Sequence, residues 1–200
     1  MSEGLKPRIF LSERFVTAVL YATTMHRDQT RKSTLIPYIC HPLGSASSVI
    51  EAGGDEDQAI GALLHDIAED CGGEPRIQEI QKMFGDRVAA IVRGCSDSLV
   101  PTEGDKAPWR ERKEAHLQHL HDATDDVLMV TAADKLNNAR AIATDLQTVG
   151  AEVWERFNAD RESILWYYHQ MWSILKDRGV SPILINPLAS AVQIMEGEMP

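Results

Sequence analysis

The sequence predicts an all-α protein, a single-domain bundle of about eight to ten helices. Apolar residues recur at helical spacing along most of the chain, and capping residues, prolines and glycines separate the segments. The 200 residues fit one domain of ordinary size, and no internal repeat or low-complexity tract divides them. We therefore expect one domain over residues 1–200, with its core at about 12–178 and a C-terminal helical extension at 180–200.

Start and stop signals place the helices of the first half. Ser12 and Asp55 are good N-cap residues, and Pro42 and Pro75 suit the first position of a helix. Gly72-Gly73 ends the central helix. The predicted helices cover about residues 12–26, 42–53, 55–72, from 75 onward, and 86–95.

A long polar connection at residues 97–108 follows, and connections of this length are often functional lids or disordered. A charged helix is predicted over Trp109–His121. Thr124 or Asp125 begins the next helix, which continues through an apolar stretch into Asn138.

The last part of the chain supplies aromatic surface for the core. The segment 151–177 contains Trp154, Trp166 and Trp172, which we expect to pack against the core. Asn186-Pro187 combines an N-cap with a proline at the first helical position and predicts a last, short amphipathic helix.

Charge and cysteine usage exclude several classes of partner. The net charge is −10 and no block of five like charges occurs, so we expect no nucleic-acid partner. No apolar run approaches the roughly 20 residues that span a bilayer, so we expect no membrane partner. The three cysteines are scattered without CxxC spacing, which favours a reduced, cytoplasmic setting. Cys40 and Cys71 are interpreted as small apolar fillers. The composition specifies no oligomeric state.

The most informative stretch sets ionisable residues into an apolar helix. At roughly 100° per residue, His65, Asp66, Glu69 and Asp70 fall within an arc of about 140° on one face. Buried carboxylates and imidazoles are costly unless they are paired or hold a metal. This pattern predicts a metal site with catalytic carboxylates beside it.

Two further residues extend this set. Asp134 ends a second apolar helix, and His41 lies where an irregular segment meets the start of the helix at Pro42. His41, His65, Asp66 and Asp134 together supply two imidazoles and two carboxylates. Such a set suits Mn²⁺, Fe²⁺ or Zn²⁺ and leaves positions open for water and a phosphate oxygen.

The order of these residues resembles the H…HD…D pattern of the HD superfamily of metal-dependent phosphohydrolases. The surrounding sequence is similar to the hydrolase domain of RelA/SpoT homologues over roughly residues 12–175. The matching motifs are Arg31-Lys32, Pro37-Tyr38-Ile39-Cys40-His41-Pro42, Leu63-Leu64-His65-Asp66-Ile67-Ala68-Glu69-Asp70 and Ala133-Asp134-Lys135-Leu136-Asn137-Asn138-Ala139-Arg140.

This resemblance implies a stand-alone alarmone hydrolase, like the metazoan SpoT homologue, that uses one Mn²⁺. Members of the family remove the 3′-pyrophosphate of ppGpp and pppGpp, leaving GDP or GTP. Carried over by position, Glu69 and Asp70 would orient and deprotonate the attacking water. The metal would be bound by His41, His65, Asp66 and Asp134.

The resemblance also implies a set of substrate-binding residues. Arg31 and Lys32 would form one wall of the nucleotide pocket, with Arg31 near the base. Asn138 would hydrogen-bond the ribose or a phosphate. Arg112 and Lys113, together with Arg110, would reach the distal phosphate from beside the long loop.

Some features depart from the family or leave alternatives open. Ser96-Asp97-Ser98 replaces the acidic Thr-Asp-Asp that many members show. An adenine alarmone, NADPH or a deoxynucleoside monophosphate therefore stays open as the substrate, as does a non-catalytic alarmone-binding module. His116, His119 and His121 could suggest a second metal site, but we expect them to be exposed histidines on a helix surface.

Overall fold

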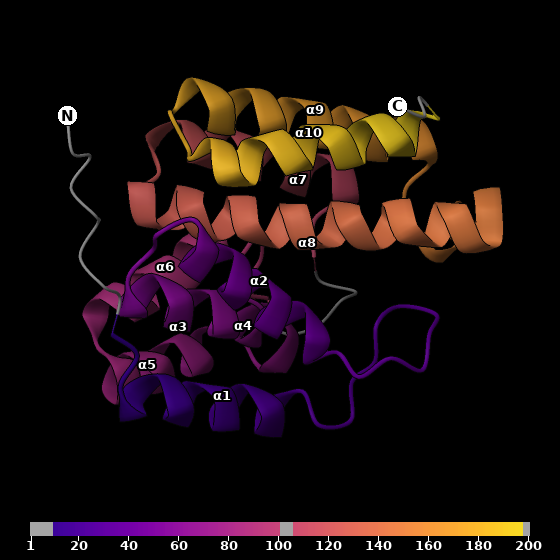
Figure 1. The fold of residues 1–200 in the computed structure, drawn as a ribbon. Coiled ribbons are helices and arrows are strands. Elements are labelled where there is room, and N and C mark those ends of the chain that lie inside the picture. The colour runs from indigo at the N-terminus through magenta and orange to yellow at the C-terminus, as the bar shows by residue number, and fades with distance from the viewer. Residues whose placement is uncertain (1–9, 101–105, 198–200) are drawn as a thin grey trace.

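The computed structural model describes residues 10–100 and 106–197 (Figure 1). The part of the chain between these bounds folds into α-helices, one 3₁₀-helix (η2) and an isolated bridge between Thr30 and Pro37, which confirms the all-α prediction. In order, the elements are α1 (Glu13–Met25), α2 (Cys40–Glu51), α3 (Glu56–Leu64), α4 (Ile67–Cys71), α5 (Glu74–Phe84), α6 (Asp86–Cys95), α7 (Trp109–Asp122), α8 (Asp125–Val149), η2 (Gly150–Arg156), α9 (Arg161–Asp177) and α10 (Pro182–Glu196).

The long helix α8 crosses the middle of the molecule and separates two groups of helices (Figure 1). Helices α1 to α6 lie on one side of it, and α7, α9 and α10 lie on the other. Its 25 residues span about 37 Å. It packs against α2, α3 and α6 on one side and against α9 and α10 on the other. This helix is therefore buried on most of its circumference, which explains its apolar first half.

The predicted caps begin α1 and α3. The side chain of Ser12 accepts a hydrogen bond from the backbone of Arg14. Asp55 forms a capping box with Gln58, so both residues satisfy backbone N–H groups that the first turn leaves without partners. The tryptophans Trp154, Trp166 and Trp172 pack partly buried against the apolar core, as predicted.

The prediction of one continuous central helix over 55–72 is wrong. It is interrupted at His65 and Asp66, which separate α3 from α4. Asp66 has φ −91° and ψ −10°, at the edge of helical geometry, and it serves as the N-cap of α4. The apolar pattern runs across this interruption because α3 and α4 both bury their residues in the same core.

Two other predicted helix starts are also wrong. Helix α2 begins at Cys40 rather than Pro42, because a turn over Pro37 to Cys40 leads directly into it. Helix α10 begins at Pro182 and includes Pro187. Ser181 and Pro182 form the same cap-then-proline signal as Asn186-Pro187, five residues earlier, and the Ser181 side chain caps Ile183.

The segment 151–177 contains two elements, and the described part of the connection 97–108 is a loop, as the sequence predicts. The first is divided into η2 and α9, with Asp160 capping α9 through the backbone of Ser163. In the second, residues 101–105 lie outside the described residues, and residues 96–100 have no helix.

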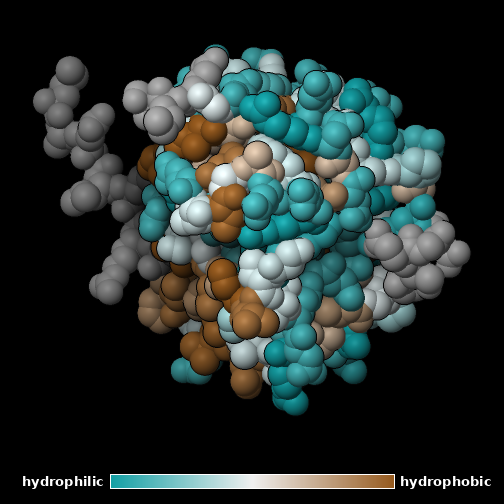
Figure 2. Space-filling view, turned by 90° about the vertical axis from the view of Figure 1, so that its right-hand side faces the viewer, coloured by the Kyte–Doolittle hydropathy of each residue, from teal (hydrophilic) through white to brown (hydrophobic). Residues whose placement is uncertain are grey.

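Figure 2 shows the face of the molecule at the C-terminal end of α8. This face is mostly hydrophilic, and hydrophobic residues gather at its lower left. Exposed large apolar side chains of the molecule include Val16 and Leu20 on α1 and Leu35 in the loop before α2. Within the described ranges, no helix is both long enough and apolar enough to cross a membrane.

The packing of α8 predicts where a truncation is costly. Leu128 on α8 is 1% exposed, whereas Leu20 on α1 is 68% exposed. Leu128→Ala should lower the free energy of unfolding by about 2–5 kcal/mol, because it leaves a cavity in the core. Leu20→Ala removes the same atoms from the surface and should change it by less than about 0.5 kcal/mol. Urea denaturation measures both, and equal losses would contradict the central position of α8.

Candidate metal centre and cavity

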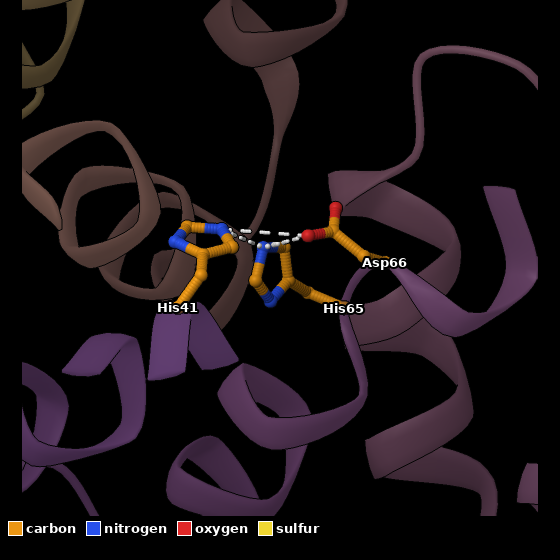
Figure 3. Close-up of side chains that lie close together, drawn as sticks. All are labelled: His41, His65 and Asp66. Atoms are coloured by element: carbon orange, nitrogen blue, oxygen red, sulfur yellow. Dashed lines mark hydrogen bonds and ion pairs between the residues drawn. The ribbon is translucent and has the colours of Figure 1, made fainter. Parts of the chain in front are cut away.

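Four side-chain atoms from three separate helical regions converge at one point. His41 Nε2 comes from α2, His65 Nε2 from the end of α3, Asp66 Oδ2 from the interruption after it, and Asp134 Oδ1 from α8 (Figure 3 shows the first three). The two imidazole nitrogens lie 3.2 Å apart. Asp66 Oδ2 lies 3.0 Å from His65 Nε2, and Asp134 Oδ1 lies 3.2 Å from His41 Nε2. The donor atoms of His41, His65 and Asp66 lie within 4.8 Å of one another, as ligands of a single ion would.

The helix interruption explains how two adjacent residues reach the same point. In a regular helix, neighbouring side chains diverge by about 100°. His65 ends α3 and Asp66 begins α4, so the change of backbone direction lets both side chains point inward. The sequence pattern places His65, Asp66, Glu69 and Asp70 on one face of a continuous helix, and this arrangement is therefore not the geometry of the site. The structure separates His65 and Asp66 at the centre from Glu69 and Asp70 on α4.

The outer nitrogens of the two histidines define the tautomers at the centre. His41 Nδ1 lies 2.7 Å from Asn137 Oδ1, and His65 Nδ1 lies 2.8 Å from the carbonyl oxygen of Ala62. Both partners are acceptors, so each Nδ1 carries the proton and donates it. When the imidazoles are neutral, each presents an unprotonated Nε2 toward the centre. Two nitrogen lone pairs and two carboxylate oxygens repel one another unless a positive charge lies among them, so the donor set fits a divalent cation.

The electrostatics agree with this requirement. Burial opposes protonation of His65, but Asp66 and Asp134 outweigh it and raise the pKa of His65 well above its usual value. Burial also opposes ionisation of Asp134, but Lys135 and the two histidines hold its pKa well below the usual range. The centre thus attracts positive charge and keeps its carboxylates ionised.

Three polar residues orient the carboxylates at the centre. The hydroxyl of Tyr38 donates to Asp66 Oδ2 at 2.5 Å. Lys135 Nζ lies 2.6 Å from Asp134 Oδ2, and Asn138 Nδ2 donates to Asp134 Oδ1 at 2.6 Å. These contacts hold both carboxylates in fixed orientations, as expected for partners of metal-ligand residues.

The structure places Glu69 on α4, beside Asp97 of the loop after α6. The backbone N–H of Asp97 donates to Glu69 Oε2 at 3.4 Å, and Lys106 Nζ lies 3.7 Å from Glu69 Oε1. Burial, followed by the neighbouring Asp97, raises the pKa of Glu69 to about 8. This carboxyl group can therefore hold or release a proton near neutral pH.

Asp70 is oriented by a chain of hydrogen bonds from the loop before α2. Gln29 Nε2 donates to Asp70 Oδ2 at 2.8 Å. The amide oxygen of Gln29 then faces the buried His26, whose Nδ1 donates to it at 2.7 Å. Burial, followed by the charge of Asp66, raises the pKa of Asp70 despite the bond from Gln29. Glu69 and Asp70 are thus held by different segments.

The structure brings some predicted substrate-binding residues together and directs others elsewhere. Arg31 Nη2 donates to Asn138 Oδ1 at 2.9 Å, so the loop before α2 is joined to the metal centre through Asn138. Lys32 donates to Asn158 at 3.0 Å, near η2. Arg112 and Lys113 both donate to the buried carboxylate of Asp97, at 3.1 Å and 2.5 Å.

A cavity of about 580 Å³ lies against the metal centre, between α8, the loop before α2, η2 and α9. Tyr38, Asn137 and Asn138 join its wall to the centre. Six cationic side chains line it although the chain has a net charge of −10: Arg31, Lys32, Lys113, Lys135, Arg140 and Arg156. Local positive charge of this kind attracts a polyanion in spite of the acidic surface.

Sequence reasoning missed several polar residues that touch the candidate site. Tyr38 and Asn137 lie inside motifs already singled out, and Asn137 follows Asp134 at helical spacing, which could have indicated their contacts. Gln29 carries no such signal, because it reaches the site from a loop. Asp97 also comes from a loop, but it lies in Ser96-Asp97-Ser98, the segment that the family resemblance already singles out. Arg112 is not among the described residues that line the cavity.

Two other expectations are wrong. His116 is buried on the inner face of α7, whereas His119 and His121 are exposed as expected. Burial, followed by the charges of Lys135 and Lys113, lowers the pKa of His116 to about 3, so this residue is neutral. Cys40 is exposed and lines the cavity rather than filling the core, because α2 begins at this residue.

Comparisons with known proteins agree on the architecture. A solved structure described as a metazoan ortholog of SpoT that hydrolyses ppGpp has a TM-score of 0.74 at 26% identity, and the match covers 96% of this chain and 100% of that one. The MESH1 guanosine-3′,5′-bis(diphosphate) 3′-pyrophosphohydrolase of Xenopus tropicalis is 33% identical over 175 residues, 86% of this chain and 88% of that protein. The corresponding protein of Danio rerio is 35% identical over 147 residues, 69% and 74% of the two chains. The model of the HD domain family matches residues 18–165, and the chain belongs to this family.

Proposed function

We propose that this chain is a Mn²⁺-dependent hydrolase that removes pyrophosphate from the 3′ position of ppGpp and pppGpp, leaving GDP and GTP. The observation that carries the proposal is a cluster of histidine and aspartate side chains that could hold a metal ion, next to a cavity lined by six cationic side chains. The names of the relatives in Xenopus tropicalis and Danio rerio indicate the same reaction and support this assignment.

The proposed ligands of the ion are His41, His65, Asp66 and Asp134, whose side-chain nitrogen and oxygen atoms converge. When bound, the ion would act as a Lewis acid toward the phosphate and lower the pKa of water. Two imidazoles and two carboxylates suit Mn²⁺, and also Zn²⁺ or Fe²⁺, better than Mg²⁺, which prefers oxygen ligands alone.

The proposed chemical step uses the two carboxyl groups on α4. Ionised Glu69 or Asp70 accepts a proton from a water molecule. At the same time, the oxygen of this water bonds to the phosphorus next to the ribose 3′ oxygen. The bond between that phosphorus and the 3′ oxygen breaks, and the 3′ oxygen takes up a proton from the protonated carboxyl group or from water. The products are pyrophosphate and the nucleoside 5′-diphosphate or 5′-triphosphate with a free 3′-hydroxyl group. The raised pKa of Glu69 lies near the working pH range, which suits a group that exchanges protons with water.

The proposed substrate contacts come from the cavity wall. Arg31 and Lys32 lie on the loop before α2, where their charges face the anionic nucleotide, and Asn138 can hydrogen-bond the ribose. Lys113 also lines the cavity and is held by Asp97, so it can neutralise the charge on the pyrophosphoryl group as this group is transferred to water. Arg112 would assist by keeping Asp97 ionised and fixed.

Catalysis should require the donor cluster. Purified protein with Mn²⁺ should release pyrophosphate from ppGpp, and His65→Ala or Asp66→Ala should abolish both release and high-affinity Mn²⁺ binding. His119→Ala, at an exposed histidine of α7, is the control and should match the wild type. Pyrophosphate release over ppGpp, pppGpp, pppApp, NADPH and deoxynucleoside monophosphates, with Mn²⁺, Mg²⁺ or Zn²⁺, measures this. Tight ppGpp binding without cleavage at any metal would favour a binding module instead.

Glu69 should contribute to both rate and pH-dependent stability. Glu69→Gln should lower kcat by about 10²–10⁴-fold, as expected when a general base is lost. In protein stripped of metal, folded Glu69 ionises near pH 8, whereas unfolded Glu69 ionises near its ordinary 4.5. Wild-type stability should therefore fall as the pH rises from about 5 to 8, because ionisation of the buried group is costly.

The neutral side chain of Glu69→Gln has no such loss, so its stability relative to the wild type should increase over the same pH interval. Urea denaturation of chelator-treated protein at several pH values measures this difference. Glu51→Gln, on the exposed end of α2, is the matched control. Parallel stability curves for the wild type and Glu69→Gln would show that Glu69 is not a perturbed group.

Arg31 should act mainly on substrate binding. Arg31→Met should raise KM for ppGpp by about tenfold or more with a smaller change in kcat, because a charge-assisted contact with the nucleotide is lost. Arg27→Met removes an exposed arginine from the start of the same loop and should leave KM unchanged. Steady-state kinetics at two salt concentrations separate the two variants, and an unchanged KM for Arg31→Met would remove Arg31 from the nucleotide pocket.

A further inference from the structure

The two ends of the cavity have different chemistry. One end adjoins the metal centre through Tyr38 and Asn138. The other end lies about 16 Å further along α8, since Asp145 follows Asp134 by eleven residues. Val153 and Phe157 supply apolar surface there. A nucleotide with its reacting phosphate at the metal centre therefore extends toward Asp145.

Asp145 is the only carboxylate among the described residues that line the cavity. It is paired with Arg156, whose Nη1 lies 2.6 Å from Asp145 Oδ2. Over the described ranges, Asp145 Oδ1 accepts no hydrogen bond, and the side chain is 36% exposed. This end of the cavity thus offers a carboxylate oxygen that can accept hydrogen bonds from a ligand.

The backbone after α8 holds this pair in place. Gly150 has φ +67°, a conformation that favours glycine, and it turns the chain from α8 directly into η2. Helix η2 then packs against α8 and brings Arg156 back to Asp145, eleven residues earlier. The pair is therefore formed by one continuous segment rather than by a chance contact between distant surfaces.

The charge of Asp145 determines which part of a nucleotide it can face. A carboxylate repels phosphate groups, so the phosphates belong near Lys113 and Lys135, which lie toward the metal centre, rather than beside Asp145. Guanine presents two N–H donors on one edge, at N1 and at the 2-amino group, and a carboxylate can accept both. Adenine presents an unprotonated N1 on the same edge, which would face the carboxylate oxygen without a hydrogen between them.

We propose that Asp145, held by Arg156, is the residue that selects guanine over adenine in this cavity, by accepting hydrogen bonds from N1–H and the 2-amino group. The inference rests on the proposed function only in placing the reacting phosphate at the metal centre. Arg156 fixes the orientation of the carboxylate, while Phe157 and Val153 contact the apolar surface of the base.

The test compares wild type and Asp145→Asn on the guanosine, inosine and adenosine 3′,5′-bis(diphosphates). Inosine lacks only the 2-amino group. Asp145→Asn should lower kcat/KM for the guanosine substrate by about tenfold to a hundredfold, through KM, as expected for a lost two-bond base contact. The inosine substrate should lose less. The adenosine substrate should be cleaved equally well or better, because the amide NH₂ of asparagine can donate to N1 of adenine.

Asp177→Asn, at an exposed residue of α9, is the matched control and should leave all three substrates unchanged. Arg156→Gln should give a smaller loss with the same order of substrates, since it loosens the carboxylate without removing it. A thermal melt of each variant shows whether it is folded.

Equal loss of kcat/KM on all three substrates would show that Asp145 is only structural, and no loss would show that the base does not contact it. A wild-type preference for the adenosine substrate would overturn the inference while leaving the hydrolase activity established. If the wild type cleaves none of the three, the proposed function fails. Calorimetric binding of the guanosine and adenosine compounds to both proteins then still decides the base preference.

Discussion

The rest of the structure depends on the convergence of four lone-pair atoms at a point between α2, α3 and α8. Both histidines direct Nδ1 to fixed acceptors, so their Nε2 atoms face two carboxylate oxygens. Such a group is costly to bury unless a positive charge lies within it. The tight packing of α8 against both groups of helices holds the donors together, and the interruption between α3 and α4 directs two adjacent side chains to one centre.

The same packing produces a local charge that opposes the charge of the whole chain. Three cations of the cavity pair with carboxylates: Lys135 contacts Asp134, Lys113 contacts Asp97 and Arg156 contacts Asp145. These partners hold the long side chains in place at the cavity wall, which lowers the entropy lost when an anion binds. An acidic protein can therefore present a binding site for a polyanion, provided that the positive residues are gathered and the negative ones are distributed over the remaining surface.

Several local features were not predicted, because the local sequence was compatible with more than one structure. Pro42 and Pro187 both suit the first turn of a helix, yet each lies inside a helix that an earlier turn or cap begins. His116 occupies a charged helix, and only the docking of α7 against the rest of the molecule buries it. The helix interruption at His65 and Asp66 contains no glycine or proline that would have predicted it. The convergence of the side chains favours this interruption, rather than a backbone preference of the two residues.

The sequence alone determined the all-α class, most helix positions and the identity of the residues at the candidate centre, because apolar periodicity, capping residues and costly buried charges are local properties of the chain. Only the tertiary structure decided which residues support that centre. Gln29 and Asp97 reach it from loops, and Tyr38 and Asn137 bond to residues of other elements that are distant in sequence. The cavity, its cationic wall and the pairing of Asp145 with Arg156 likewise exist only because helices distant in sequence pack side by side.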